Sequence, residues 1–588
     1  MPEVVHYRVS MLRPHTHLFE VRATFPPGPD TLDAVLPVWT PGSYMVREFS
    51  RHLQDLRAEG PEGQPLAVRR VDKRTWRVEA RGLAVTLRYR VYAHELSVRT
   101  SHLDGSHGYF NGATLFLYTE ATRGLAHHVT LEAPEGWTAF CALDARDGVF
   151  EADSYDTLVD SPFEVGPHTP LGFTAAGVPH QVVVWGDAVP DAARLCEDLR
   201  RVCEAQARLF GGLPMKRYLF LVYLTDKGRG GLEHQASTAL VFPRVGLGNP
   251  RGWEDFLTLA AHEYFHLWNI KRVKPRAFVP VDYAQENYTS LLWAFEGITA
   301  YYDNRMVLRA GLMSASRYLV RLGETLSALQ ATPGRKTQSL AESSFLCWVK
   351  HYRPDENSPN SAISYYLKGE VVAVLLDLEL RRATDNARGL DDLMRRLWER
   401  HGDGSGVPEE GVEAAASELA GCDLSAFFDR AVRGTEELDN SVFAHVGLEV
   451  RTRPRESAND RGGTPPPRTR SEGRPKGWLG LIPKGGATFA SVVEGSPAHE
   501  AGVYGDDELV ALDGWRADTS ALLSRCEDKA PGDTVRLTVF RRDKLVEVPV
   551  VLGQKPADAV WLARVDRPTE AQKAAFQAWL GTAWDELG

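Results

Sequence analysis

Residues 261–269 read Ala-His-Glu-Tyr-Phe-His-Leu-Trp-Asn, and they carry the strongest structural signal in the central part of the chain. It lies in an apolar segment that predicts a helix over 253–271. In a helix, His262 and His266 project from one face one turn apart, so both imidazoles can bind a single Zn²⁺ ion at about 2.0–2.1 Å. Glu263 follows the first ligand, and a carboxylate there can accept a proton from a water that the metal activates. The stretch therefore predicts a catalytic zinc site.

A catalytic zinc needs a third protein ligand and one open position, and two glutamates compete for the third place. Glu286 follows His266 with 19 residues between them, close to the spacing in thermolysin-like enzymes, whereas Glu296 has 29 and requires an insertion. Glu286 lies in a polar stretch that is typical of a surface loop. Glu296 lies in the apolar segment 291–302, which predicts a buried helix where a lone carboxylate is costly unless it meets a metal or a cation. We therefore predict Glu296 as the third ligand.

The composition excludes several classes of protein. With 43% hydrophobic and 25% charged residues, the 588-residue chain is typical of a globular protein with several domains. Its net charge of −10 disfavours a nucleic-acid partner held by a general basic field. No apolar run approaches the roughly 20 residues that span a bilayer, and the amino terminus lacks the apolar run of a signal peptide. Six scattered cysteines without a CxxC pair indicate no disulfide framework, so we expect a cytoplasmic protein.

Two kinds of periodicity divide most of the chain. Up to about residue 170, short β-branched or aromatic stretches between turn clusters predict strands, in a sandwich or an open sheet. From about residue 187 helical periodicity dominates, with one buried strand. We expect strands at 4–10, 17–25, 85–91, 114–118, 180–185 and 218–224. We expect helices at 191–209, 253–271, 288–309, 314–330, 365–382 and 390–401.

Further motifs accompany the histidines in chain order. Gly230-Gly231-Leu232-Glu233-His234 follows the strand at 218–224 and resembles the Gly-Ala-Met-Glu-Asn motif of aminopeptidase N-like enzymes. Residues 366–369, Tyr-Leu-Lys-Gly, resemble their Tyr-x-Lys-Gly motif. The segments around His262 and Glu296, together with residues 37–49, are similar to the glycyl aminopeptidase family of the gluzincin clan of zinc peptidases. The resemblance spans nearly the whole chain.

The resemblance implies a role for each motif. Glu233 binds the free α-amino group of a peptide substrate, and the Tyr366 hydroxyl stabilises the oxyanion. Gly230 and Gly231 let the substrate backbone approach, and small amino-terminal residues such as Gly and Ala are preferred. His234 replaces the asparagine of the related motif and is a further candidate for substrate binding. Thermolysin-like enzymes orient a ligand histidine with an aspartate four residues after the ligand glutamate, but Ala300 stands there, so the orienting groups cannot be identified from the sequence.

The carboxyl-terminal part resembles a PDZ domain. Gly477-Trp-Leu-Gly-Leu-Ile resembles its carboxylate-binding loop, and Ser-Pro-Ala and Asp-Gly motifs follow. Such a loop and its adjoining strand suit a peptide or a carboxyl-terminal ligand, and an unused groove on a purely structural PDZ domain is the alternative. We expect its first strand at 443–451. The segment 453–476, rich in Pro, Gly and Arg, predicts a disordered insertion. A helix is expected over 569–580 with Thr569 as its N-cap.

Together the motifs predict a multidomain α+β protein that acts as a zinc-dependent aminopeptidase, with one Zn²⁺ per chain, on peptides with a free amino terminus. Two alternatives stay open: a zinc endopeptidase in which Glu233 meets no amine, and a PDZ scaffold or quality-control adaptor with a structural zinc. The predicted domains are a β-rich amino-terminal domain at 1–172, a thermolysin-like catalytic subdomain with a mixed sheet at 173–312, a helical subdomain at 313–440, a PDZ-like β domain at 441–555 and a helical tail at 556–588.

Overall fold

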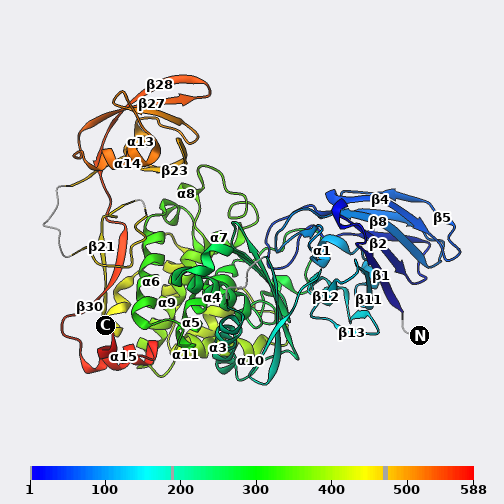
Figure 1. Ribbon diagram of the computed structural model, residues 1–588. Coiled ribbons are helices and arrows are strands. Elements are labelled where there is room, and N and C mark those ends of the chain that lie inside the picture. Colours follow the sequence, from blue (N-terminus) through cyan, green and yellow to red (C-terminus); the bar gives the residue numbers. More distant parts are fainter. Residues whose placement is uncertain (1–2, 187–190, 458, 468–474, 588) are drawn as a thin grey trace. The chain divides into compact units, whose positions relative to one another are not determined.

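The computed structural model describes residues 3–186, 191–457, 459–467 and 475–587. Its contacts divide the chain into two compact units. Unit 1 comprises residues 1–288, 302–312 and 395–408, and unit 2 comprises residues 289–301, 313–394 and 409–588. The division between residues 301 and 302 falls inside helix α5 (Ile298–Arg309), so this unbroken helix belongs to both units. Figure 1 labels the elements and colours them along the sequence.

The first part of unit 1 is built of β-strands, as predicted, and they are the blue and cyan arrows of Figure 1. Alternate side chains of the first strand, those of Val5, Tyr7 and Val9, are buried in one apolar core, as expected for a sheet with one covered face. The largest sheet has eight strands in the order β13 (Asp144–Arg146), β14 (Val149–Ala152), β11 (Ala126–Glu132), β1 (Val4–Ser10), β2 (Leu18–Phe25), β8 (Val85–Tyr92), β4 (Leu53–Glu59) and β5 (Pro65–Leu66).

Two smaller sheets complete this part of unit 1. One has three strands in the order β3 (Thr31–Val35), β7 (Thr75–Glu79) and β6 (Val68–Arg70). The other has four strands in the order β12 (Thr138–Phe140), β15 (Phe163–Gly166), β10 (Gly108–Phe110) and β9 (Ser101–Leu103). Strands β9 and β10 form an antiparallel hairpin, which places the residues of its turn in a fixed position.

The strand predicted at 114–118 is wrong. Residues Gly112–Leu115 form a short helix, α1, and the Asn111 side chain caps it by accepting a hydrogen bond from the Ala113 backbone N–H. All four residues of α1 are buried, so burial there follows no period that would separate a strand from a helix. Only Tyr118 has a strand-like pairing, an isolated bridge with Val35.

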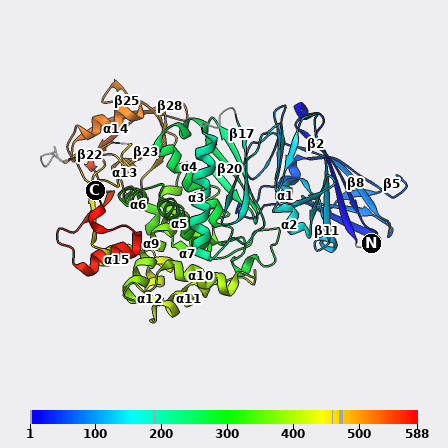
Figure 2. The same ribbon diagram turned by 60° about the horizontal axis from the view of Figure 1, so that its bottom comes forward.

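A five-stranded mixed sheet follows in unit 1. Its order is β16 (Leu171–Ala175), β17 (Val178–Trp185), β18 (Tyr218–Thr225), β20 (Ser237–Pro243) and β19 (Gly230–Glu233). Strands β17, β18 and β20 run parallel, whereas β19 runs antiparallel to β20 at the edge of the sheet. Helices α3 (Ala192–Phe210) and α4 (Pro250–Phe265) lie side by side (Figure 2). The edge strand and α4 also pack against each other, and both carry predicted site residues.

The predicted helices agree with the structure apart from the ends of two of them. The helix predicted at 253–271 ends at Phe265, because the chain then turns and Ile270 has a φ of 121°. The helix predicted at 288–309 begins with a π-helical turn, η6 (Trp293–Gly297), and continues as α5. The helices that agree are α3, α6 (Ala315–Gln330), α9 (Tyr365–Ala383) and α10 (Leu390–His401).

The PDZ-like region of unit 2 has its own apolar core, which extends from Leu479 to Leu552. It also contains the helices α13 (Pro497–Glu500) and α14 (Thr519–Glu527). The main path of its sheet runs in the order β23 (Leu481–Gly485), β24 (Thr488–Val492), β25 (Glu508–Leu512), β27 (Thr534–Arg541) and β28 (Lys544–Val551), shown in orange in Figure 1.

Two expectations for the flanks of this region need correction. The strand expected at 443–451 is β21 (Leu448–Arg453), and it pairs with β30 (Ala559–Arg564) outside the PDZ sheet. The insertion predicted to be disordered is held by contacts in part, because Arg453 forms an ion pair with Asp460 at 2.5 Å and the Gly463 N–H donates to the Val560 carbonyl at 2.7 Å. Residues 458 and 468–474 of this insertion lie outside the described residues.

The closing helix of unit 2 agrees with its prediction. Helix α15 (Glu570–Leu580) has Thr569 as its N-cap in a capping box with Gln572, and Gly581 ends it in the left-handed conformation. The whole chain therefore has the predicted mixed architecture of a β-rich front, a largely helical middle and a PDZ-like end. Among the described helices, none combines the length and the hydropathy needed to cross a membrane.

Candidate functional site

The two predicted zinc-binding histidines lie at the end of α4. Asn249 caps the start of this helix, and His262 and His266 lie at its end with their ring centroids 4.8 Å apart. After His266 the chain turns back, and the His266 Nδ1 donates a hydrogen bond to the Asn269 carbonyl oxygen at 2.6 Å. This bond places the proton on Nδ1 and leaves Nε2 as the nitrogen that could bind a metal. The early end of α4 thus gives His266 the orienting partner that the sequence did not reveal.

Asp303 orients the other ring. Its Oδ2 lies 3.6 Å from Nδ1 of His262, and a carboxylate in that place favours Nε2 of the ring as a metal ligand. Helix α5, which carries Asp303, packs against α4 through stacked rings of Phe265 and Tyr302 at 4.5 Å. The sequence did not reveal Asp303, because the orienting aspartate of thermolysin-like enzymes lies four residues after the ligand glutamate, and this chain has Ala300 at that distance from Glu296. A residue seven positions further along, two helical turns away, also lies on the same face of a helix, and this spacing from Glu296 could have identified Asp303.

Glu296 lies in the π-helical turn directly before α5. Its side chain is buried, with 2% exposure, and it precedes Asp303 by two turns on the continuous helical path. One nitrogen of His262, one nitrogen of His266 and one carboxylate oxygen of Glu296 lie within 4.8 Å of one another. Two imidazoles and one carboxylate make up a ligand set of catalytic zinc. The competing Glu286 lies in the loop before this turn and is partly exposed.

A pair of glycines brings the turn of Glu296 against helix α9. A Cβ added to Gly297 would lie 2.4 Å from the Cα of Gly369, a distance that real Cβ atoms do not reach. Gly369 closes the motif that begins at Tyr366, one turn earlier on α9. The Tyr366 hydroxyl lies 3.1 Å from that of Tyr352. Burial, followed by the negative charge of Glu296, raises the pKa of Tyr366 well above its ordinary value, so its hydroxyl stays a hydrogen-bond donor.

Glu233 lies at the end of edge strand β19, and its side chain is 3% exposed. One ligand atom of each of Glu233, Glu263 and His266 lies within 4.8 Å of the others. Unit 1 therefore brings the carboxylate predicted to bind an amine next to the predicted base and one predicted zinc ligand.

Gly231 provides the space that Glu263 occupies. A Cβ on Gly231 would lie 2.2 Å from Oε1 of Glu263, so any other residue at this position would displace the carboxylate. The neighbouring Gly230 is less confined, because its Cβ would lie 3.6 Å from the Arg99 guanidinium, an ordinary van der Waals contact. The two glycines of the edge strand therefore differ, because Gly231 leaves the space in which the Glu263 carboxylate lies and Gly230 does not.

Gly42 covers Glu233 from the amino-terminal β-rich part of unit 1. Its φ is 89°, and a Cβ there would lie 2.6 Å from both carboxylate oxygens of Glu233. The cavity beside these two residues has a volume of about 170 Å³, and Tyr44, Asp160 and Lys271 contribute to its wall. Gly42 was not among the predicted site residues, although it lies in the segment 37–49 that carried part of the resemblance.

His234 belongs to a polar network around Asp160. Its side chain is buried, and its Nδ1 lies 3.3 Å from Oδ1 of Asp160. The same carboxylate accepts hydrogen bonds from Lys271 Nζ at 2.5 Å and from the Gln235 backbone N–H at 2.8 Å. Burial alone would raise the pKa of Asp160, but the charge of Lys271 and the bond with His234 lower it below its ordinary value. This network positions the chain directly after Glu233.

Models of three protein families match the chain. The M61 peptidase N-terminal domain matches residues 6–167, the M61 glycyl aminopeptidase matches residues 255–372, and the PDZ domain matches residues 450–552. The second match includes all three predicted zinc ligands, Glu263 and Tyr366.

Solved and curated proteins are similar over different lengths. An aminopeptidase N family protein from Idiomarina loihiensis is 34% identical, with a TM-score of 0.92, over 98% of this chain and 100% of that one. An M1 zinc metallopeptidase from Deinococcus radiodurans is 12% identical, with a TM-score of 0.46, over 74% of this chain and 95% of that one. A probable periplasmic serine endoprotease DegP-like from Chlamydia muridarum is 40% identical over 74 residues, or 12% of this chain. The chain spans 15% of the length of that relative.

Proposed function

The chain belongs to the M61 glycyl aminopeptidase family, and on this basis we propose that it is a zinc-dependent aminopeptidase that hydrolyses the amino-terminal peptide bond of peptides. The observation that carries the proposal is the position of Glu233, whose carboxylate lies within 4.8 Å of ligand atoms of Glu263 and His266. A buried carboxylate is stabilised by a cationic partner, and the ammonium group of a peptide is such a partner. With the ammonium held there, only the first peptide bond lies beside Glu263.

The donor set supports Zn²⁺ as the cofactor of this site, in the predicted ratio of one catalytic ion per chain. His262, His266 and Glu296 would hold it, with the Asn269 carbonyl and Asp303 behind the two rings. When bound, Zn²⁺ supplies Lewis-acid polarisation of the scissile carbonyl and lowers the pKa of the attacking water. The orienting partners on both rings match the arrangement that metal-binding histidines require.

Three side chains of the protein carry the remaining chemistry of the proposal. Glu263 accepts the proton of the attacking water and delivers it to the leaving amine. Tyr366, protonated because of its raised pKa, donates a hydrogen bond to the carbonyl oxygen as negative charge develops there. One such donor contributes about 3 kcal/mol to transition-state stabilisation. Glu233 holds the substrate ammonium and so fixes which bond is cleaved.

A preference for small amino-terminal residues is part of the proposal. It is supported by Gly42, which lies directly against the Glu233 carboxylate, and by the small cavity of about 170 Å³ beside them. Hydrolysis of Gly-, Ala- and Leu-anilides under the same conditions would rank the preference, and kcat/KM is expected to be higher for Gly and Ala than for Leu.

Acetylation of the substrate amino group is expected to lower kcat/KM at least a hundredfold. Removing one partner of a buried ion pair costs about 3–5 kcal/mol, and the acetyl group also occupies the space beside Glu233. The measurement compares Ala-anilide with N-acetyl-Ala-anilide. Glu233→Gln should narrow the difference between the two substrates, whereas the acetyl group should have its full effect in a Glu286→Gln control. Equal cleavage by the unaltered protein would support the endopeptidase alternative instead.

Gly231→Ala is expected to lower kcat by about tenfold to a hundredfold, the range that a displacement of about 1 Å costs a catalytic group. The reason is steric, because the added methyl group would meet the Glu263 carboxylate at 2.2 Å. Gly124→Ala, where an added methyl group would meet no atom within 4 Å, is the control and should keep its activity. The steric argument fails if both variants hydrolyse Ala-anilide at the same rate.

Two further proposals concern a ligand of the PDZ-like region and the location of the protein in the cell. Strand β23 lies at the edge of the PDZ sheet, which supports a peptide or carboxyl-terminal ligand added to it as a further strand. A cytoplasmic location is supported by the six cysteines, all of which are free thiols in the structure.

A further inference from the structure

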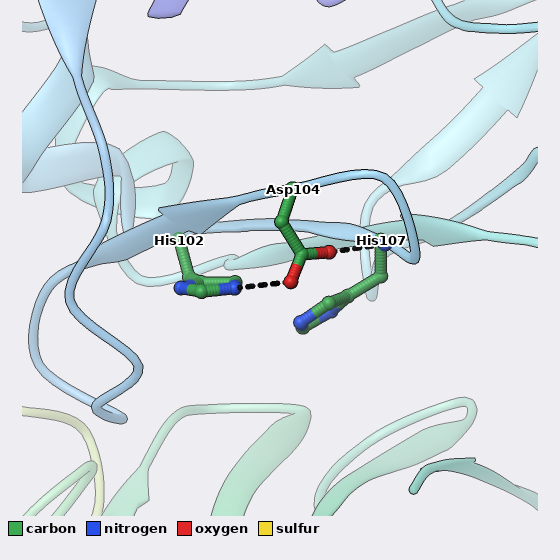
Figure 3. A group of neighbouring side chains, drawn as sticks. All are labelled: His102, Asp104 and His107. Carbon is green, nitrogen blue, oxygen red and sulfur yellow. Dashed lines mark hydrogen bonds and ion pairs between the residues drawn. The ribbon is translucent and has the colours of Figure 1, made fainter. Parts of the chain in front are cut away.

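We propose that the β9–β10 hairpin carries a second metal site, for a divalent first-row transition-metal ion, formed by His102, Asp104 and His107. His102 lies in β9, and the turn Asp104-Gly-Ser-His107 connects it to β10. The Asp104 N–H donates to the His107 carbonyl at 3.0 Å, and Asp104 Oδ1 accepts from the His107 N–H at 3.2 Å. Figure 3 shows the Asp104 carboxylate between the two histidines. The hairpin therefore holds all three side chains together independently of the catalytic residues.

The distances suit a small cation. One ligand atom of each of the three residues lies within 4.8 Å of the other two. His102 Nε2 is 3.2 Å from Asp104 Oδ2, and the ring centroids of His102 and His107 are 5.1 Å apart. Ligand atoms around a tetrahedral zinc ion with bonds of about 2.0–2.1 Å are separated by about 3.3 Å. The pair formed by His102 and Asp104 already has this separation, and His107 offers the third ligand atom within 4.8 Å of the other two.

His107 has the form of a metal ligand. It is completely buried, and its Nδ1 lies 3.0 Å from Oε1 of Glu164. A carboxylate at Nδ1 places the ring proton there and directs the lone pair of Nε2 outward, as in carboxylate–histidine–metal arrangements. Within the part of the chain that the structure describes, the buried Nε2 has no hydrogen-bond partner. The Trp185 ring stacks on His107 at 4.5 Å and holds it in this orientation. A metal ion would satisfy the buried lone pair.

A neighbouring group, His107, Glu164 and His168, also has its ligand atoms within 4.8 Å of one another, but its contacts are already satisfied. The Glu164 carboxylate accepts hydrogen bonds from His107, from His168 Nε2 at 2.6 Å and from the Tyr223 hydroxyl at 2.9 Å. A metal ion there would have to displace these donors. The observations therefore favour Glu164 as the group that orients His107 and leave His168 outside the site.

The charges and the exposure of the hairpin also suit a cation. Asp104 and Glu164 together contribute two negative charges, which a divalent ion would compensate. The Asp104 side chain is 32% exposed, while that of His102 is 8% exposed. Solvent therefore reaches the site from the side of Asp104, and an ion can enter by that path.

Counting zinc ions in the full-length protein tests the proposal. After treatment with a chelator and dialysis against excess Zn²⁺, the unaltered protein is expected to bind two zinc ions per chain, one more than the catalytic site accounts for. His262→Ala/His266→Ala should bind one. Adding Asp104→Asn or His102→Asn to that background should lower the count from one to zero. This background makes the result independent of the proposed peptidase activity.

Two controls keep the outcome clear. In the His262→Ala/His266→Ala background, His168→Asn should still bind one zinc ion per chain. If this variant bound no zinc, the neighbouring group of His107, Glu164 and His168 would replace the proposed ligand set. Asp104→Asn keeps an oxygen able to accept the hydrogen bonds of the turn, so the hairpin should stay folded, which circular dichroism can check. A Co²⁺-loaded His262→Ala/His266→Ala protein should show visible absorption that Asp104→Asn abolishes. One zinc in the unaltered protein, or no change on altering His102 or Asp104, would overturn the proposal.

Discussion

Glu263→Gln is expected to retain the catalytic zinc and to lower kcat for Ala-anilide by about a thousandfold, within the range of about 10²–10⁴ for the loss of a general acid–base group. The amide has nearly the shape of the carboxylate, so it fits the space left by Gly231. It cannot accept a proton from the attacking water, and the metal ligands are untouched. Activity and zinc content are measured on the same preparation, so that loss of the base is distinguished from loss of the metal.

A matched control for this variant lies on the same helix. Glu254→Gln removes a carboxylate nine residues earlier in α4, at a partly exposed position, and should leave kcat and zinc content close to those of the unaltered protein. Substantial activity of Glu263→Gln would rule out the assignment of Glu263 as the base. Loss of zinc from it would show that Glu263 helps to hold the metal.

Glu296→Gln is expected to remove one zinc ion per chain at limiting zinc concentration and to lower activity at least a hundredfold. An amide binds Zn²⁺ more weakly than a carboxylate does, and in a buried position it also removes the negative charge that attracts the ion. Excess zinc should restore part of the activity, because His262 and His266 are still present. The measurements are zinc content after dialysis and hydrolysis of Ala-anilide at graded zinc concentrations.

Glu286→Gln is the natural control for the third ligand, since Glu286 was the competing candidate in the sequence. It lies in a loop and is partly exposed, so its substitution should change neither zinc content nor activity by more than a factor of about two, as is usual for surface positions. If Glu286→Gln loses zinc and Glu296→Gln does not, the assignment of the third ligand must be reversed.

The main elements could be predicted because periodicity and local capping residues determine them. Helix α10 begins and ends where its apolar period does, and Thr569 and Gly581 mark the ends of α15. The premise for choosing Glu296 over Glu286 agrees with the structure, since Glu296 is buried and Glu286 is partly exposed, and the choice itself stays a prediction. Each of these inferences needed only residues that are close together in the sequence.

The remaining features depend on contacts between distant segments. Gly42 meets Glu233 across 191 residues, and β21 pairs with β30 across more than 100 residues, so no local pattern indicates either contact. Asp303 follows Glu296 by only seven residues and is therefore a local feature of the sequence. The spacing in thermolysin-like enzymes, however, predicts the orienting aspartate at position 300, where this chain has alanine. His107 was overlooked for a different reason, because its partner Glu164 comes from another strand.

The contact between Gly42 and Glu233 has a consequence for how an exopeptidase is built. The edge strand β19 and helix α4 would by themselves leave the amino-terminal side of a bound chain unobstructed, as an enzyme that cuts within chains requires. In the proposed mode of binding, the loop around Gly42, which comes from the β-rich amino-terminal part of unit 1, would stop the substrate chain at its first residue. The release of one residue at a time would then depend on the loop around Gly42 and not on β19 or α4. A longer or shorter loop at this place would change how many residues are released.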